Sequence, residues 1–407
     1  MKVDAEAAGM DAARLARIDE HLKNRYVDAG KIAGCQVAVV RRGNVAHYSE
    51  LGLADRERRL PVGQDTIWRI YSMTKPITGV ALMTLYERGH FQLSDPVSRF
   101  IPSWRSMKVA EKSGDGAVRL VDPVRPISIR DVLMHMSGLG YGRDNLDLNL
   151  ESEDGKIKAP STRFDSLEDM VERQAGWPLR FQPGTRWLYS FGTDVCARLV
   201  EIISGRRFDQ YLDEEVFGPL GMRDTAFHVD DDRAPRFASL YGRNSRKELV
   251  LLDDPQDSTY RKPPAFLSGG GGLVSTLGDY LRFCQMLLGG GELDGRRVLG
   301  RKTVELMTVN HLPGGGSMSD FALPGGYGEV GFDGMGFGLT MAVSKGPAQT
   351  GIVGSPGEYM WGGAASTVFW VDPAEDLLVV FMTQLLPSGT FNFRGQLKAL
   401  VYPAIVD

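Results

Sequence analysis

The stretch Ser72-Met73-Thr74-Lys75 places a hydroxyl and a primary amine three residues apart. At the start of a helix, this spacing puts both side chains on the same face. A lysine that is removed from water can hold a lowered pKa and accept the serine proton, and the helix N-terminus favours the anion that develops. The spacing therefore predicts a nucleophile with its own base. An isolated pattern of this kind is equally compatible with a helix cap followed by a surface lysine.

The flanking residues favour the catalytic interpretation. Residues 66–71 are β-branched and aromatic, so they predict an extended segment that leads into Ser72. Pro76 follows in the first helical turn, where its missing N–H costs little. Residues 77–86 are apolar nearly all round, which predicts a buried helix. A serine at the mouth of a buried helix is placed as a nucleophile should be.

Two further stretches could contribute to such a site. Tyr189 follows an extended run and precedes a predicted helix, and a tyrosine close to a lysine ammonium can have its pKa lowered and carry protons. Residues 359–366 predict a strand in which Gly362 and Gly363 allow a ligand to approach the backbone closely. Each signal is weak alone, because a tyrosine is more often a core aromatic.

The elements that would position these residues come from both ends of the chain. Near the N-terminus we expect a helix over residues 11–26 and a hairpin of strands 36–40 and 45–48. Near the C-terminus we expect strands at 338–343, 366–371 and 377–382, then a helix around 393–402. This order predicts an α/β (α+β) fold with one antiparallel sheet built from both termini and flanked by helices.

The middle of the chain reads as an inserted, mainly α-helical domain. Helices are expected at 129–135, 166–174, 192–203 and 207–215. We therefore divide the chain into a discontinuous α/β domain, residues 1–86 and 212–407, and a helical domain, residues 87–211. A binding cleft is expected between them. Residues 106–121 and 140–162 read as long loops that could cover the pocket.

Composition excludes several classes of function. The chain has 407 residues, 43% of them hydrophobic and 24% charged, and a net charge of −4 without a long basic run, which argues against nucleic acid as a partner. The N-terminus enters an acidic, helical segment with no apolar stretch of signal-peptide length, which predicts a cytoplasmic protein. The sequence contains no uninterrupted run of about 18 apolar residues, so a membrane-spanning helix is not predicted.

Metal and disulfide chemistry are not predicted either. Cys35, Cys196 and Cys284 are far apart in apolar contexts, as expected for buried free thiols. The histidines show no paired spacing typical of metal sites. His135 is expected to be structural, at a helix C-terminus before a glycine cap, with a general-base role as the alternative.

Together and in this order, the motifs resemble the serine β-lactamase and penicillin-binding-protein superfamily, in particular its class C-like branch and the family VIII carboxylesterases. The likeness covers most of the chain and includes residues 93–97, 129–139, 217–222 and 270–276. It implies that Ser72 is the acylated nucleophile, that Lys75 activates it, and that Tyr189 relays protons. It also implies an oxyanion hole formed by the backbone N–H groups of Ser72 and of Ala364 on the strand, and no cofactor.

Two departures from the β-lactamase pattern bear on the substrate. Trp361-Gly362-Gly363 stands where that branch carries Lys-Thr-Gly, and Phe191 stands where the tyrosine motif ends in asparagine. Replacing the cation with an indole removes a charge-assisted contact of roughly 1.5–3 kcal/mol. These four residues are the predicted substrate-binding positions, with Trp361 either a pocket wall or simple strand packing, and they favour uncharged, hydrophobic esters.

The leading hypothesis is a cofactor-free serine hydrolase that cleaves short-chain carboxylic esters. One alternative keeps the fold but acts on amides, as a β-lactamase, D-amino-acid peptidase or transpeptidase. Another is a non-catalytic binding protein of the same fold. The expected partner is a small-molecule ester, and the oligomeric state is left open. Because no serine lies in a Gly-x-Ser-x-Gly pattern, a lipase-type nucleophile turn is not predicted.

Overall fold

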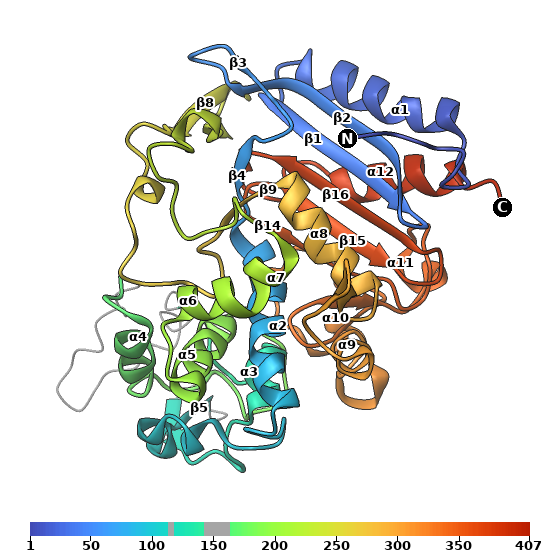
Figure 1. The fold of residues 1–407 in the computed structure, drawn as a ribbon. Coiled ribbons are helices and arrows are strands. Elements are labelled where there is room, and N and C mark those ends of the chain that lie inside the picture. Colours follow the sequence, from blue (N-terminus) through green and yellow to red (C-terminus); the bar gives the residue numbers. More distant parts are fainter. Residues whose placement is uncertain (113–117, 142–162) are drawn as a thin grey trace.

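A computed structural model describes residues 1–112, 118–141 and 163–407 of the chain. Its centre is an antiparallel sheet in the order β12-β13-β14-β15-β16-β1-β2-β3 (Figure 1). The strands are β1 Gly34–Arg41, β2 Asn44–Asp55, β3 Leu60–Pro61, β12 Met335–Phe337, β13 Ala342–Ser344, β14 Tyr359–Gly363, β15 Thr367–Asp372 and β16 Leu377–Thr383. The predicted sheet, assembled from both ends of the chain, is confirmed.

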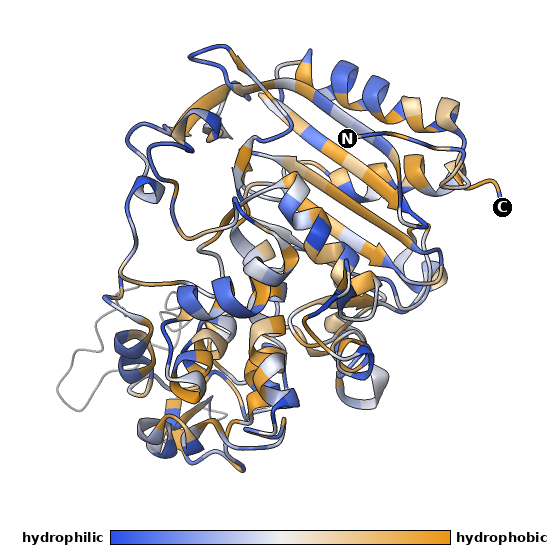
Figure 2. Ribbon diagram, viewed as in Figure 1, coloured by the Kyte–Doolittle hydropathy of each residue, from blue (hydrophilic) through white to orange (hydrophobic). Residues whose placement is uncertain are grey.

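Helices cover both faces of this sheet. α1 (Ala12–Leu22) and α12 (Phe393–Val401) pack together on one face, and α8 (Leu277–Leu288) lies across the other (Figure 1). Every residue of β1 and β16 is consequently buried. Figure 2 shows that hydrophobic residues concentrate along these central strands, whereas hydrophilic residues mark the outward side of α1. Burial on two faces explains why both strands read as nearly continuous apolar runs.

The second part of the molecule is mainly helical and lies below the sheet in Figure 1. Its buried axis is α2, in which every residue from Thr74 to Leu85 is buried, as predicted from the apolar sequence. α2 packs against α5. The helices around it are α2 Thr74–Glu87, α3 Ile129–Leu133, α4 Leu167–Gln174, α5 Gly192–Ser204 and α6 Phe208–Leu212.

Smaller elements complete the chain. The remaining helices are α7 Gly218–Leu220, α9 Arg301–Met307, α10 Met318–Phe321 and α11 Pro347–Thr350. The remaining strands are β4 Ile67–Arg69, β5 Val109–Lys112, β6 Val118–Val121, β7 Leu240–Arg243, β8 Leu249–Asp253, β9 Val274–Thr276, β10 Glu292–Leu293, β11 Arg296–Arg297 and β17 Leu385–Leu386.

Two predictions about these elements were wrong. Residues 338–343 are not one strand: β12 and β13 flank a turn in which Thr340 has φ +73° and its N–H donates to Leu133 O. That conformation cannot continue a strand. Residues 106–121 are not simply a loop, because β5 pairs with β6 at the end of the helical part that lies away from the sheet (Figure 1). Most of the other predicted loop, residues 142–162, lies outside the described residues.

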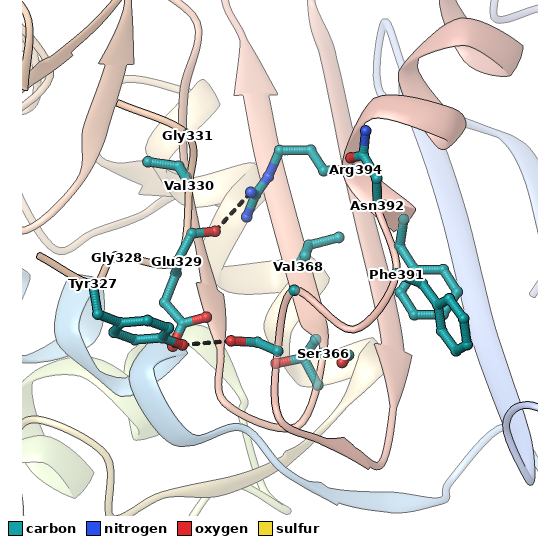
Figure 3. A pocket seen from close by; sticks show the side chains of 14 residues that line it. Tyr327, Gly328, Glu329, Val330, Gly331, Ser366, Val368, Phe391, Asn392 and Arg394 are labelled. Carbon is teal, nitrogen blue, oxygen red and sulfur yellow. Dashed lines mark hydrogen bonds between the residues drawn. The ribbon is translucent and has the colours of Figure 1, made fainter. Parts of the chain in front are cut away.

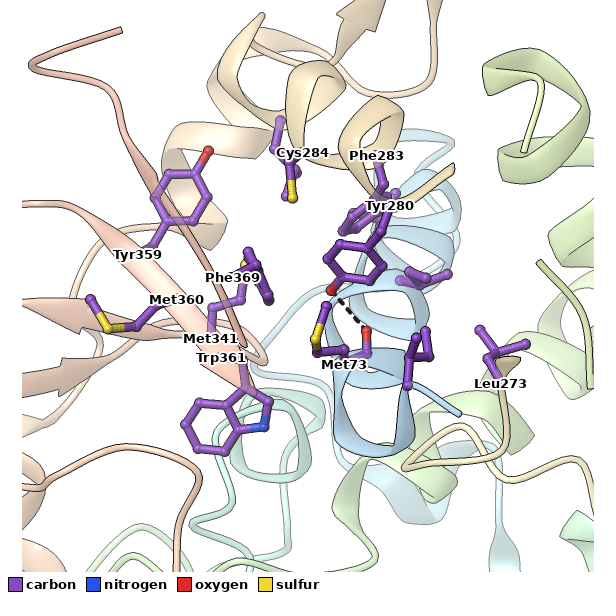
Figure 4. Close-up of a cluster of buried hydrophobic side chains, with 14 of the residues drawn as sticks. Met73, Leu273, Tyr280, Phe283, Cys284, Met341, Tyr359, Met360, Trp361 and Phe369 are labelled. Carbon is purple, nitrogen blue, oxygen red and sulfur yellow. Dashed lines mark hydrogen bonds between the residues drawn. The ribbon is translucent and has the colours of Figure 1, made fainter. Parts of the chain in front are cut away.

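The core extends from the sheet to the first residues of α2. Figure 4 shows Tyr280 of α8 beside Met73, and the Tyr280 hydroxyl donates to Met73 O over 2.9 Å. The Tyr280 ring also lies 5.2 Å from that of Phe369. All three cysteines are buried and free, as predicted. Among the described helices, none combines the length and the apolar character needed to cross a membrane.

Candidate active site

Ser72 lies on a tight turn at the junction of the two parts of the molecule. β4 pairs with β9 and leads into a single 3₁₀ turn, Tyr71–Met73, so α2 begins two residues after the serine. Tyr71 has φ +42°, a conformation that costs energy for any residue other than glycine. Strain is thus concentrated directly beside Ser72, whose side chain sits in a largely buried position.

Lys75 contacts Ser72 as the spacing predicted. Its Nζ lies 3.3 Å from Ser72 Oγ and donates to Gly270 O over 2.7 Å. The residue is only 1% exposed. Burial lowers the pKa of Lys75 to about 8, although the carboxylates of Asp194 and Glu329 oppose that shift. A useful fraction of the amine is therefore uncharged near neutral pH and can accept a proton.

Tyr189 lies next to Lys75, but its protonation differs from the expectation. The Lys75 Nζ lies 4.4 Å from the centroid of the Tyr189 ring, and Trp361 Nε1 donates to the Tyr189 hydroxyl over 3.2 Å. Burial raises the pKa of Tyr189 well above its usual value, and this outweighs the opposing hydrogen bonds with Ser72 and Trp361. The predicted lowering of this pKa was wrong, because burial of the phenol disfavours its charged form. Tyr189 is a neutral phenol in this structure.

The end of β14 reaches the nucleophile turn. A Cβ on Gly363 would lie 2.3 Å from Ile70 O and 2.4 Å from Thr367 Oγ1, so only glycine fits there. A Cβ on Gly362 would lie 3.0 Å from Arg394 Nη2. Ala364 was expected on the strand, but β14 ends at Gly363 and Ala364 is the first residue of the turn beyond it. The close approach at Gly363 leaves no side chain between β14 and the segment before Ser72.

Trp361 and Phe191, the two aromatic residues that depart from the β-lactamase pattern, are related to Tyr189 in different ways. Trp361 is fully buried, with its ring 5.5 Å from that of Tyr189 and 5.4 Å from that of Phe337, so it offers no surface to a substrate in this structure. Phe191 packs edge-on against Tyr141 at 4.7 Å, and Tyr141 in turn contacts the ring of Tyr189 at 5.7 Å. Trp361 thus acts on the site through the tyrosine, while Phe191 extends its apolar surroundings.

A cavity of about 350 Å³ is lined by residues 327–331, by residues 366–368 and by residues of the segment 388–394 (Figure 3). Tyr327 lies on the cavity wall, and its ring is 5.9 Å from that of Tyr189. Its hydroxyl donates a hydrogen bond to Glu329 Oε1 over 2.8 Å. Arg394 donates to the backbone carbonyls of Glu329 and Trp361, at 2.8 and 2.9 Å. The Tyr327 ring therefore links the wall of the cavity to Tyr189.

His135 packs against Tyr189, and no hydrogen bond between the described residues joins it to Ser72. It lies two residues past the end of α3, with φ +58°, and Nδ1 is 3.1 Å from Ser190 Oγ. Its ring packs on Tyr189 at 4.9 Å. Burial lowers the pKa of His135 well below its usual value, so the ring is neutral. These contacts favour the structural interpretation. Within the part of the chain that the structure describes, no three His, Cys, Asp or Glu side chains are grouped to hold a metal ion.

Comparison with known proteins identifies the family. A family model described as Beta-lactamase matches residues 16–402. The chain belongs to the β-lactamase family. It is 35% identical to Protein Rv1367c of Mycobacterium tuberculosis over 89% of this chain and 88% of that protein. It is 30% identical to Esterase EstB of Burkholderia gladioli over 95% of each chain.

A solved structure agrees with these matches. The fold is similar to that of EstCE1, described as a hydrolase with promiscuous acyltransferase activity, with a TM-score of 0.76 and 27% identity over 97% of this chain and 99% of that one. Together with the EstB match, this confirms the predicted resemblance to the esterase branch of the β-lactamase superfamily.

Two acidic residues of this β-lactamase-family site were missed in the sequence. Asp194 is 1% exposed and Glu329 is 9% exposed, and both act electrostatically on Lys75. Asp194 lies five residues after Tyr189, and an acid inside an otherwise apolar helix start was the available signal. Glu329 stands in a glycine-rich loop without a recognisable motif, so only the fold brings it to the site.

Proposed function

We propose that this chain is a carboxylesterase that forms an acyl-enzyme on Ser72. The observation that carries the proposal is the grouping of Ser72, Lys75 and Tyr189, with Lys75 Nζ 3.3 Å from Ser72 Oγ and 4.4 Å from the centroid of the Tyr189 ring. A serine with a buried, partly deprotonated amine beside it is an activated nucleophile. The similarity to Esterase EstB supports esters as the substrate class.

In the proposed acylation, neutral Lys75 takes the proton of Ser72 as Oγ attacks the ester carbonyl. The negative charge on the carbonyl oxygen is stabilised by the backbone N–H groups of Ser72 and Ala364, a type of donor worth about 3 kcal/mol of barrier each. As the C–O bond breaks, Tyr189 donates its proton to the leaving alkoxide. It regains a proton from the Lys75 ammonium, because its raised pKa disfavours a lasting phenolate.

Deacylation runs through the same groups. Water attacks the acyl carbonyl while Tyr189 and Lys75 take up its proton, and Ser72 Oγ leaves as the acid product forms. The proton returns to Ser72, which restores the resting site. Each step therefore uses groups that already lie around Ser72 Oγ.

The surroundings of the site support uncharged substrates with short acyl groups. Trp361-Gly362-Gly363 brings no cation to the strand, and Phe191 and Tyr141 present apolar rings next to Tyr189. A substrate carboxylate would find no lysine on this strand to pair with. This argues against the amide-cleaving alternatives, whose substrates carry such a group.

The test is a side-by-side rate comparison on p-nitrophenyl acetate, butyrate and octanoate and on a chromogenic cephalosporin. We expect fast cleavage of the short esters, slow or absent cephalosporin opening, and a loss of at least about a thousandfold in kcat for Ser72→Ala. Ser49→Ala changes a buried serine of β2 and should leave the rates unchanged. Full ester turnover by Ser72→Ala would refute the proposal, and faster cephalosporin cleavage would refute the specificity argument.

A further inference from the structure

Asp194 is a buried carboxylate that the proposed reaction does not use. It lies in the first turn of α5 and is 1% exposed. Its Oδ1 accepts a hydrogen bond from Ser268 Oγ over 2.6 Å and another from the backbone N–H of Gly270 over 3.0 Å. It forms no ion pair with any residue that the structure describes. Burial raises the pKa of Asp194, and the hydrogen bond from Ser268 and the nearby Lys75 amine oppose that shift. Keeping a carboxylate in such a position is costly, which indicates a purpose other than simple packing.

The loop that Asp194 holds leads directly to Lys75. The Gly270 peptide is bonded on both sides: its N–H donates to Asp194, and its carbonyl accepts from Lys75 Nζ over 2.7 Å. A Cβ on Gly270 would lie 2.6 Å from Asp194 Oδ2, so the loop can approach the carboxylate only as glycine. The neighbouring Gly269 carbonyl accepts from Thr78 Oγ1 of α2 over 2.8 Å, which fixes the loop to the helix that carries Lys75.

We propose that Asp194 is a positioning residue: through the backbone of Gly270 it fixes the carbonyl that orients the Lys75 amine toward Ser72. The inference rests on the proposed role of Lys75 as the base. Asp194 itself does not contact Ser72 in the described hydrogen-bond network, so it acts through Lys75.

The charge and the hydrogen bonds of Asp194 have separable effects. The titratable groups around Lys75 are Asp194 of α5, Glu329 of the loop before β12, Tyr189 and His135. Of the two acids, Asp194 acts more strongly on Lys75, and its charge favours the protonated amine. An asparagine would keep an acceptor oxygen for the loop but remove the charge, so Lys75 would deprotonate more easily. An alanine would remove both.

The experiment measures kcat, KM and the pH dependence of kcat/KM on a short p-nitrophenyl ester for the wild type, Asp194→Asn and Asp194→Ala. For Asp194→Asn, we expect the fall of kcat/KM on the acid side of the profile to occur at lower pH. The ratio of kcat/KM at pH 6 to its plateau value should then be roughly threefold higher than in the wild type. We expect Asp194→Ala to lose roughly 10- to 100-fold in kcat with KM almost unchanged, because the base is misplaced while binding is retained.

The matched control is Asp279→Asn. Asp279, on α8, is also buried and holds a loop, accepting from Asp224 N over 2.8 Å and from Thr225 Oγ1 over 3.0 Å. The Asp279→Asn variant should lower the melting temperature without shifting the acid side of the pH profile. Two results together would overturn the inference. The acid side of the pH profile of Asp194→Asn would coincide with that of the wild type, and Asp194→Ala would lose no more kcat than Asp279→Asn.

Two further variants keep the test decisive if the Asp194 variants fail to fold. Ser268→Ala removes one donor to the carboxylate and leaves the charge, so we expect a few-fold loss in kcat, and an unchanged kcat would overturn the inference. Ser72→Ala is measured in parallel. If Ser72→Ala stays active, the proposed function has failed. If it is inactive while the Asp194 and Ser268 variants behave as the wild type, only the positioning role has failed.

Discussion

The chemistry of Lys75 follows from where α2 places its side chain. The residue is almost completely buried, yet it donates to a backbone carbonyl and is influenced by two carboxylates. Burial favours the neutral amine, and the acids favour the ammonium. The balance leaves the pKa of Lys75 at about 8, close to the range in which a base that must gain and lose a proton works best.

A pH dependence follows from this balance. Because the pKa of Lys75 is lowered from 10.5 to about 8, the amine is mostly neutral above pH 8 and mostly charged below it. We expect kcat/KM for a p-nitrophenyl ester to fall about tenfold for each pH unit below roughly 7.5. Stopped-flow or steady-state rates from pH 5 to 9.5 at constant ionic strength, corrected with Ser72→Ala, measure this limb. A flat profile between pH 7 and 5 would contradict the role of Lys75.

For individual residues, the sequence was sufficient to predict contacts between side chains that are close together along the chain. Ser72 and Lys75 meet because they are three residues apart at a helix start, which is a local property. The protonation of Tyr189 and the burial of Trp361 depend on what packs around them, so they could not be predicted from spacing. Asp194 was missed for the same reason, since its role appears only when the loop around Gly270 folds against it.

Among the elements, β14 ends directly against the segment before Ser72. Gly363 is the last residue of the strand, and its neighbours leave no room for a side chain. We expect Gly363→Ala to push β14 away from the segment before Ser72. The expected result is a loss of at least about tenfold in kcat and about 1–3 kcal/mol in the free energy of unfolding.

Ester rates and urea denaturation of Gly363→Ala measure both effects. Gly63→Ala is the matched control, because a Cβ there would meet its nearest atom only at 3.6 Å. Wild-type rates in Gly363→Ala would show that the strand end does not need to lie so close to Ile70.

The elements were predictable to the extent that their patterns are regular. The hairpin of β1 and β2 and the strands β15 and β16 follow apolar runs separated by turn residues, and they were found. The run at 338–343 has the same composition, but Leu339 and Thr340 donate their backbone N–H groups to Met307 and Leu133, which lie far away in the sequence, and only residues 342–343 pair with strands. The division into residues 1–86 with 212–407 and residues 87–211 remains our proposal for the domains.

At the scale of the whole molecule, a buried ion pair joins the C-terminal helix to the sheet. Lys398 of α12 contacts Glu358, just before β14, and the two side chains are 3% and 2% exposed. Tyr402 donates to Glu358 over 2.7 Å and to Asp372 of β15 over 2.8 Å. The pair fixes how α12 lies against the strand that lines the site.

We expect Lys398→Met to lower the free energy of unfolding by about 3–5 kcal/mol, because Glu358 would stay buried without its cation. Adding Glu358→Gln should restore part of the loss. Urea denaturation measures both, and Lys302→Met, at an exposed pair with Glu305, is the control expected to change nothing measurable. A wild-type midpoint for Lys398→Met would mean that the pair does not hold the helix.

The pairing of β1 with β16 sets an order of events during synthesis. Gly34–Arg41 leaves the ribosome long before its partner Leu377–Thr383 is synthesised. Until then, β1 has β2 on one edge and an open, apolar edge on the other, the kind of edge that invites pairing with another chain. The nascent protein must therefore protect this edge of β1 until β16 has been synthesised, and chaperone dependence should follow from topology more than from any weakness of the finished fold.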